Sequence, residues 1–133
     1  LNDKDVINTD IEILIINSFG VMPKYFNYCK NIFIGKSFIK EMKNDSGQNP
    51  IEAAKLGCKV LHGPYVYNFQ EVYDFLNSYG LTEKVNNEQE LANKIIENFE
   101  IPTQASLQQL NLLNIYGEKI LNETVKEISN YLK

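Results

Sequence analysis

The sequence predicts an α/β fold in which helices cover both faces of a parallel β-sheet. Residues 11–16 form a short, almost continuous apolar run, which is the pattern of a strand buried on both faces. Residues 31–35, 59–62 and 81–85 are further predicted strands, and helix signals lie between the successive strands. Because this alternation favours parallel pairing, the loops that follow the strands are expected to meet at one edge of the sheet.

The first helix is expected over residues 22–30, because Pro23 stands in its first turn and apolar residues recur at three-four spacing. Its apolar residues are Met22, Tyr25, Phe26 and Cys29. Cys29 and Cys58 show no metal-ligand spacing and lie in helical or apolar surroundings. Each is therefore expected to be a reduced, buried thiol in a reducing compartment.

The second helix follows a loop, residues 36–48, that is long for a connection between a strand and a helix. Asn49 is the expected N-cap, Pro50 the first helical residue and Glu52 a first-turn carboxylate that suits the helix dipole. Gly57 is the expected C-terminal stop. Long loops inside compact domains are usually functional or mobile, so this one is a candidate for function.

Two more helices are expected before Pro102. Asn68 is predicted to cap the first of them, which ends near Gly80. Asn87 and Glu90 have the spacing of a capping box for the second, over residues 88–99. The residues expected to face inward are Phe69, Val72, Tyr73, Phe75 and Leu76 on the first helix and Leu91, Ile95 and Ile96 on the second.

Residues 103–133 have a helical pattern that Gly117 is expected to interrupt. The last part places Leu121, Val125, Ile128 and Leu132 on one stripe, which predicts a helix packed on the domain; a partner-binding helix is the alternative. The predicted organisation is an α/β domain over residues 1–102 and C-terminal helices over residues 103–133.

Composition excludes several classes of protein. The chain has 133 residues, enough for one domain with its own core. Thirteen Lys, no Arg and a net charge of −4 argue against a nucleic-acid partner. No run of about twenty apolar residues is present, and the first residues lack the features of a signal peptide, so the chain itself is expected to be soluble.

One anion site is predicted at the carboxyl edge of the sheet. Residues 46–49 can present free backbone N–H groups, and the helix that follows adds the positive end of its dipole. The loops at residues 18–20, 35–49 and 63–68 all follow predicted strands and should converge there. A nucleotide phosphate is the expected anion.

The motifs around this loop match one family in order and spacing. The central block is GQNPIEAA at residues 47–54, followed by LG at 56–57, GP at 63–64 and NF at 68–69. In these residues the chain resembles the C-terminal, donor-binding half of 3-deoxy-D-manno-octulosonic acid (Kdo) transferases, whose pattern is G-G-H-N-P-x-E-P/A-A-x-x-G, a strand, and G-P-x-x-x-N-F. Upstream, FIGKSF at residues 33–38 resembles the family's F-V-G-G-S, and SFG at 18–20 its T/S-x-G-E turn.

The resemblance implies a partial Rossmann-like donor domain of the two-domain architecture called GT-B. It implies metal-independent transfer of Kdo from CMP-Kdo to a lipid A precursor at the cytoplasmic face of the bacterial inner membrane. The family keeps its acceptor site and catalytic carboxylate in an N-terminal domain that nothing here matches, so the chain is expected to be a fragment that transfers nothing alone. The donor contacts implied by the motifs are Ser18, Gly20, Ser37, Gly47, Gln48, Asn49, Glu52 and Asn68.

Among these residues Glu52 is the expected ribose contact, because a first-turn carboxylate that faces the strand ends can accept from both ribose hydroxyls. The chain departs from the family pattern at three positions: Gln48 replaces His, Lys36 replaces the second Gly of G-G-S, and Val21 replaces Glu. A GT-B domain for another nucleotide sugar, such as a UDP-sugar, and a non-catalytic nucleotide-binding or interaction module are the alternatives.

Two further features favour ordinary structural roles. Lys36, Lys40 and Lys43 flank apolar residues and could meet anionic lipid or the donor's carboxylate, but a solvated loop is the favoured interpretation. His62, the only histidine, has no Asp, Ser or Cys at triad spacing, and a structural role is favoured.

Overall fold

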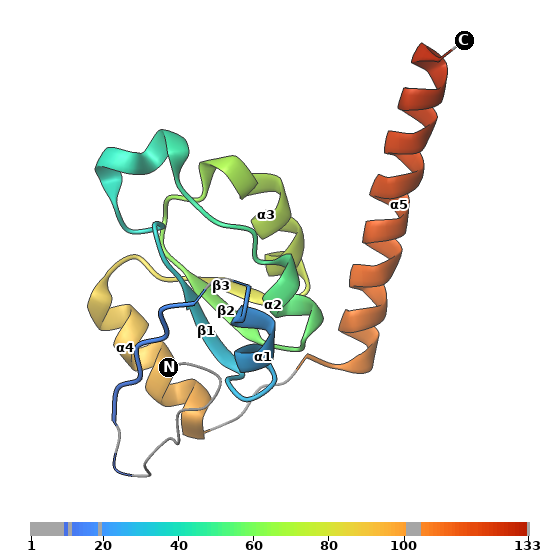
Figure 1. The fold of residues 1–133 in the computed structure, drawn as a ribbon. Coiled ribbons are helices and arrows are strands. Elements are labelled where there is room, and N and C mark those ends of the chain that lie inside the picture. The colour runs from blue at the N-terminus through green and yellow to red at the C-terminus, as the bar shows by residue number, and fades with distance from the viewer. Residues whose placement is uncertain (1–9, 11, 19, 101–104, 133) are drawn as a thin grey trace.

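The computed structural model describes residues 10, 12–18, 20–100 and 105–132 (Figure 1). Three strands and five α-helices are assigned in these residues, together with the 3-10 helices η1 (Lys40–Asp45) and η2 (Tyr67–Phe69). The strands are β1 (Asn31–Ile34), β2 (Lys59–His62) and β3 (Thr82–Lys84). The α-helices are α1 (Met22–Phe26), α2 (Ile51–Lys55), α3 (Gln70–Ser78), α4 (Glu88–Glu100) and α5 (Leu107–Tyr131).

The three strands form a parallel sheet in the order β1-β2-β3, which confirms the predicted α/β, Rossmann-like fold class. Ile32 pairs with Val60, and Val60 pairs with Thr82. Val60 and its neighbour Leu61 are both fully buried. Since successive side chains of a strand point to opposite faces, β2 is covered on both sides.

Helices cover the two faces unequally. On one face, Val60 and Ile34 pack with Phe26 of α1, Ala53 of α2 and Tyr73 of α3. Figure 1 shows α4 on the other side of the sheet, and the side-chain amide of Asn31 donates to the carbonyl of Asn98 in α4 at 3.4 Å. Residues of α2, α3 and α5 form a second, outer cluster. The core therefore lies mainly between the sheet and the α2–α3 layer.

The predicted strand over residues 11–16 is not found in the described part of that segment. Residue 11 lies outside the described residues, and Glu12 to Ile16 form no strand. Ile13 and Ile15 are 82% and 80% exposed. A strand is stabilised by pairing with a neighbour, and an apolar run by itself does not supply one.

The structure of α5 differs from the sequence predictions for residues 103–133 in two respects. Gly117 does not interrupt it, because a glycine costs only about 1 kcal/mol in a helix interior and α5 has 25 residues and a capping box made by Ser106 and Gln109. Its second half does not pack on the domain. The predicted stripe residues Leu121, Val125, Ile128 and Leu132 are all exposed, and Figure 1 shows this half extending beyond the other elements.

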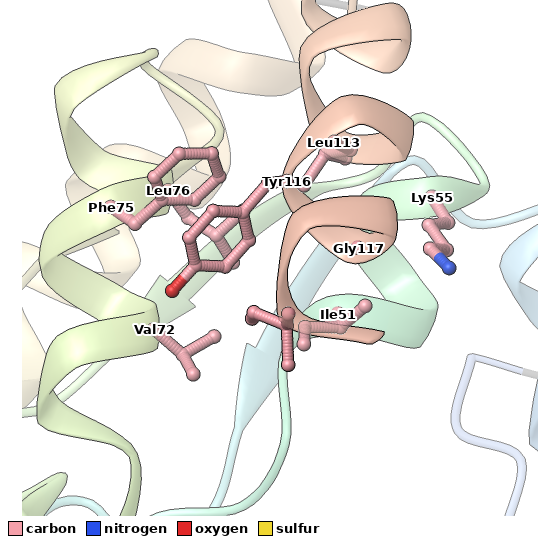
Figure 2. A pocket seen from close by; sticks show the side chains of 9 residues that line it. Ile51, Lys55, Val72, Phe75, Leu76, Leu113, Tyr116 and Gly117 are labelled. Carbon is pink, nitrogen blue, oxygen red and sulfur yellow. The ribbon is translucent and has the colours of Figure 1, made fainter. Parts of the chain in front are cut away.

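The first half of α5 does pack on the α2–α3 layer. Leu113 is buried, and the ring of Tyr116 stacks on that of Phe75 with centroids 3.7 Å apart. Between these helices lies an apolar cavity of about 180 Å³ (Figure 2). Its lining comprises Ile51, Lys55, Val72, Phe75, Leu76, Leu113, Tyr116, Gly117 and Ile120.

In the part of the chain that the structure describes, no helix is long and apolar enough to cross a bilayer.

The side chains of α1 and α4 match the sequence predictions only in part. α1 ends at Phe26, so Cys29 lies in the turn beyond it and is exposed; both cysteines are free, and only Cys58 is buried. Ile96 of α4 is exposed rather than inward. Asn87 does cap α4, because its Oδ1 accepts from the N–H of Glu90 at 2.9 Å.

Lys36 is the one non-glycine residue with a positive φ among the described residues, at 62°. This is the position at which the resembled family has glycine, and a side chain in the left-handed region costs roughly 1 kcal/mol. We expect Lys36→Gly to raise the free energy of unfolding by about 1 kcal/mol in urea denaturation. Lys43→Gly is the matched control, and its ordinary φ predicts a small loss of stability instead. Equal effects of the two changes on the free energy of unfolding would show that the positive φ of Lys36 does not cost stability.

Candidate functional site

The loops after β1 and β2 are joined by one fully buried side chain, that of Ser37. Its Oγ donates to the carbonyl of Ile34 at 2.7 Å and accepts from the N–H of Gly63 at 2.8 Å. The N–H of Tyr65 donates to the carbonyl of Ser37 at 2.9 Å. Gly63 cannot carry a side chain here, because a Cβ would collide with that same carbonyl oxygen. These contacts hold the two loops together at the carboxyl edge of the sheet.

A second set of contacts holds the stretch that precedes α2. The Oγ of Ser46 donates to the carbonyl of Lys43 at 2.8 Å, and the carbonyl of Ser46 accepts from the N–H of Asn68 at 3.3 Å. Gly47 has φ +88° and packs on the backbone of Val66. The backbone of this stretch is thereby fixed before any ligand arrives.

Tyr73 of α3 makes a contact that the sequence did not predict. Its hydroxyl donates to the carbonyl of Gln48 at 3.0 Å, although the helical pattern marked it only as a core residue. Burial raises the pKa of Tyr73, so the hydroxyl stays protonated and remains a donor. A helical pattern shows that a residue faces inward, but it does not show which loop the polar tip of its side chain reaches.

Three of the predicted contact residues, Gln48, Asn49 and Glu52, have exposed side chains on this fixed backbone. The Oδ1 of Asn49 accepts from the N–H of Ile51 at 3.0 Å, but the N-cap residue of α2 is Pro50 rather than the predicted Asn49, and Pro50 has no side-chain hydrogen bond to give. α2 has only five residues, so its dipole is weaker than the sequence suggested. At this candidate site, the groups that could meet a ligand are therefore side chains more than the helix end.

The other predicted contacts occupy different environments. Ser37 is buried and bonded on both sides, so its hydroxyl serves the loop junction. Asn68 was predicted to cap α3 but lies in η2, where its Nδ2 donates to the Oδ1 of Asp45 at 3.3 Å and no side-chain cap is formed. Ser18 and Gly20 are exposed, and no hydrogen bond of the described residues joins them to residues 46–52. Two of the three predicted loops converge in the structure.

Lys43 supplies positive charge near the junction. Lys43 lines a hollow of about 300 Å³ between the two loops, together with Asn44, Pro64, Tyr65, Val66, Tyr67 and Gln70. Over residues 10, 12–18, 20–100 and 105–132, no group of three or more His, Cys, Asp or Glu side chains has the arrangement of a metal site. The polar side chains near the junction include amides, hydroxyls, the carboxylates of Asp45 and Glu52, and Lys43.

This arrangement defines a class of protein: a parallel α/β fold with its polar loops gathered at the carboxyl ends of the strands, where such folds bind ligands. The resemblance noted in the sequence is confirmed by comparison with curated proteins. The chain is 24% identical over 115 residues to the 3-deoxy-D-manno-octulosonic acid transferase of Aquifex aeolicus (strain VF5). It is 34% identical over 61 residues to the 3-deoxy-D-manno-octulosonic acid transferase of Bordetella pertussis.

The extent of these matches is partial. The first covers 85% of this chain and 31% of the Aquifex protein, and the second covers 46% of this chain and 13% of the Bordetella protein. The chain thus spans about a third or less of the curated relatives it matches. A scan against family models gives no match. The comparisons support a glycosyltransferase relationship of the Kdo transferase type.

The close approach of Gly47 to Val66 can be tested by substitution. In Gly47→Ala, a Cβ would lie 2.9 Å from the Cα of Val66, and the residue would also hold a positive φ. We expect the free energy of unfolding to fall by about 2 kcal/mol or more. Gly35→Ala is the matched control, because a Cβ there meets nothing within 4 Å, and its effect should stay within about 0.5 kcal/mol. Equal losses in the two variants would show that the loop does not pack as described.

Proposed function

We propose that this chain is the donor-binding part of a glycosyltransferase that transfers Kdo from CMP-Kdo to a lipid A precursor at the cytoplasmic face of the bacterial inner membrane. The similarity to two Kdo transferases supports the reaction class. The observation that carries the proposal is the stretch at residues 46–52, whose backbone is fixed by Tyr73 and Val66 while the side chains of Gln48, Asn49 and Glu52 are exposed.

Each of these exposed side chains suits one part of a nucleotide sugar. The carboxylate of Glu52 can accept from both hydroxyls of a ribose, and charged acceptors make the stronger hydrogen bonds. Asn49 accepts from the N–H of Ile51 with its Oδ1, which leaves its Nδ2 to donate to a phosphate. The side-chain amide of Gln48 can also donate to a phosphate, but it carries no titrating group. Lys43 supplies a positive charge at the adjoining loop.

The reaction we assign needs charge stabilisation more than proton transfer on the donor side. An acceptor hydroxyl oxygen forms a bond to the anomeric carbon of Kdo and gives its proton to a general base, and the bond from that carbon to the phosphate oxygen breaks, releasing CMP. Donors placed at the leaving phosphate stabilise the charge that develops there. Under this proposal Asn49, Gln48 and Lys43 have that role, no metal ion is required, and no residue of this chain is assigned as the catalytic base.

Nucleotide titration tests the proposal. We expect CMP to raise the melting temperature of the chain, because a ligand at a hundred times its dissociation constant adds about 2.7 kcal/mol to the free energy of unfolding. UDP should give a smaller shift at the same concentration. A preference for UDP would assign the domain to another nucleotide sugar, and no response to either nucleotide would favour a non-catalytic interaction module.

The same titration, followed by calorimetry, locates the site. Glu52→Ala should weaken CMP binding about tenfold or more, which is the usual cost of losing a charged hydrogen-bond partner. Glu71→Ala is the matched control, since Glu71 is also an exposed first-turn carboxylate, on α3. Equal affinities of the two variants would remove Glu52 from the site.

A further inference from the structure

The two cysteines of the chain lie together at the amino edge of the sheet, at the opposite end of the strands from the candidate site. Cys29 is in the turn between α1 and β1, and Cys58 directly precedes β2. The N–H of Lys59 donates to the carbonyl of Lys30 at 2.8 Å, which holds the two segments that enter the sheet side by side. Neither thiol has a part in the proposed glycosyltransferase function.

The side chain of Cys58 reaches the backbone of Cys29. The Sγ of Cys58 lies 3.3 Å from the carbonyl oxygen of Phe26 and 3.4 Å from that of Cys29. Since a carbonyl oxygen is about 2.4 Å from the Cα of its own residue, the Cα of Cys29 is within about 6 Å of this sulfur. A disulfide needs Cα atoms roughly 4.4–6.8 Å apart. Rotation of the two side chains, with a small backbone movement, can therefore join the two sulfurs.

The two thiols differ in access and in surroundings. Cys29 is exposed, whereas Cys58 is fully buried, so a reagent in solution reaches Cys29 first. The Nζ of Lys30 donates to the carbonyls of Phe26 at 3.4 Å and of Leu56 at 3.1 Å, which places a positive charge beside Cys58. Burial raises the pKa of Cys58, the Lys30 ammonium lowers it in part, and the nearby Cys29 thiol raises it further.

One accessible thiol with a buried thiol in reach is the arrangement of an attacking and a resolving cysteine. We propose that Cys29 is a modification site for low-molecular-weight disulfides and that Cys58 resolves the adduct into a Cys29–Cys58 disulfide. The Cys29 thiolate bonds to one sulfur of the external disulfide, whose S–S bond breaks and releases one thiolate. Cys58 then gives its proton to solvent, bonds to the Cys29 sulfur and displaces the second thiolate. Two protein thiols are oxidised, and one external disulfide is reduced to two thiols.

Oxidised glutathione tests this on the full chain, followed by mass spectrometry without reductant. We expect the reaction to end in a monomer two hydrogens lighter than the reduced chain, with peptide mapping that links Cys29 to Cys58. Dithiothreitol should restore the reduced mass. A glutathione adduct that persists without an internal disulfide, a disulfide-linked dimer of the chain, or no reaction would each overturn the proposal. No nucleotide is used, so this outcome is independent of the nucleotide titration.

Cysteine variants assign the two roles. Cys58→Ser should stop at one glutathione adduct on Cys29, and Cys58→Ala should give the same result without placing a hydroxyl in the core. Cys29→Ser should react about tenfold or more slowly than the unaltered chain, because its remaining thiol is buried. Since Cys29 is exposed, this variant leaves the core unchanged. Reaction of Cys29→Ser as fast as that of the unaltered chain would contradict the assignment.

A lysine variant tests the resolving step separately. Lys30→Gln should prolong the lifetime of the glutathione adduct severalfold, because it removes the charge that favours the Cys58 thiolate. Lys24→Gln is the matched control, since Lys24 is an exposed lysine of α1 and makes neither of these contacts; its adduct should have the lifetime found in the unaltered chain. Equal lifetimes in the two variants would show that Lys30 does not assist Cys58.

Discussion

The hydroxyl of Ser37 is the contact on which the rest of the site depends. It lies at the point where β1 and β2 end, and it bonds to the backbone of both, through Ile34 and Gly63. A buried hydroxyl with both bonds made contributes only about 1 kcal/mol, but leaving the N–H of Gly63 without a partner costs about 1–3 kcal/mol. The absence of a side chain at Gly63 is part of the same arrangement, since a Cβ would displace the loop. Two loops that are distant in sequence therefore behave as one structural unit.

That unit explains how the backbone before a five-residue helix is held in place. α2 is too short to contribute much as a dipole, yet the residues before it are held by Tyr73, Val66 and the backbone of Asn68. Fixing the backbone in advance lowers the entropy that a ligand must overcome on binding. Two polar regions accompany this unit, with Gln48, Asn49 and Glu52 in one and His62, the last residue of β2, in the other. Both regions lie at the carboxyl ends of the strands, where parallel α/β sheets usually bind ligands.

Local sequence patterns predicted the strands well. The predicted ranges 31–35 and 59–62 differ from β1 and β2 by at most one residue, because the apolar runs and their flanking glycines are local signals. Residues 11–16 carry the same pattern, but a strand also needs a neighbour, and none pairs with the described part of the segment. The stripe of α5 is amphipathic as predicted, yet amphipathicity does not identify the surface that covers it, and its second half is exposed. At the site, a hydrogen bond from Asn49 to the start of α2 was predictable from adjacent residues, although the N-cap itself is Pro50. The role of Ser37 was not, because it arises from a contact with a residue 26 positions away.

The most direct test of the contact between Ser37 and Gly63 is amide hydrogen exchange at Gly63 in the full chain. The N–H of Gly63 donates to a buried side chain rather than to a strand partner, so its protection reports the loop junction itself. We predict that Gly63 exchanges as slowly as the buried amides of β2, and that Ser37→Ala accelerates exchange at Gly63 while the centre of β2 stays protected. Exchange at Gly63 as fast as in an exposed loop of the unaltered chain would contradict the claim that Ser37 joins the two loops.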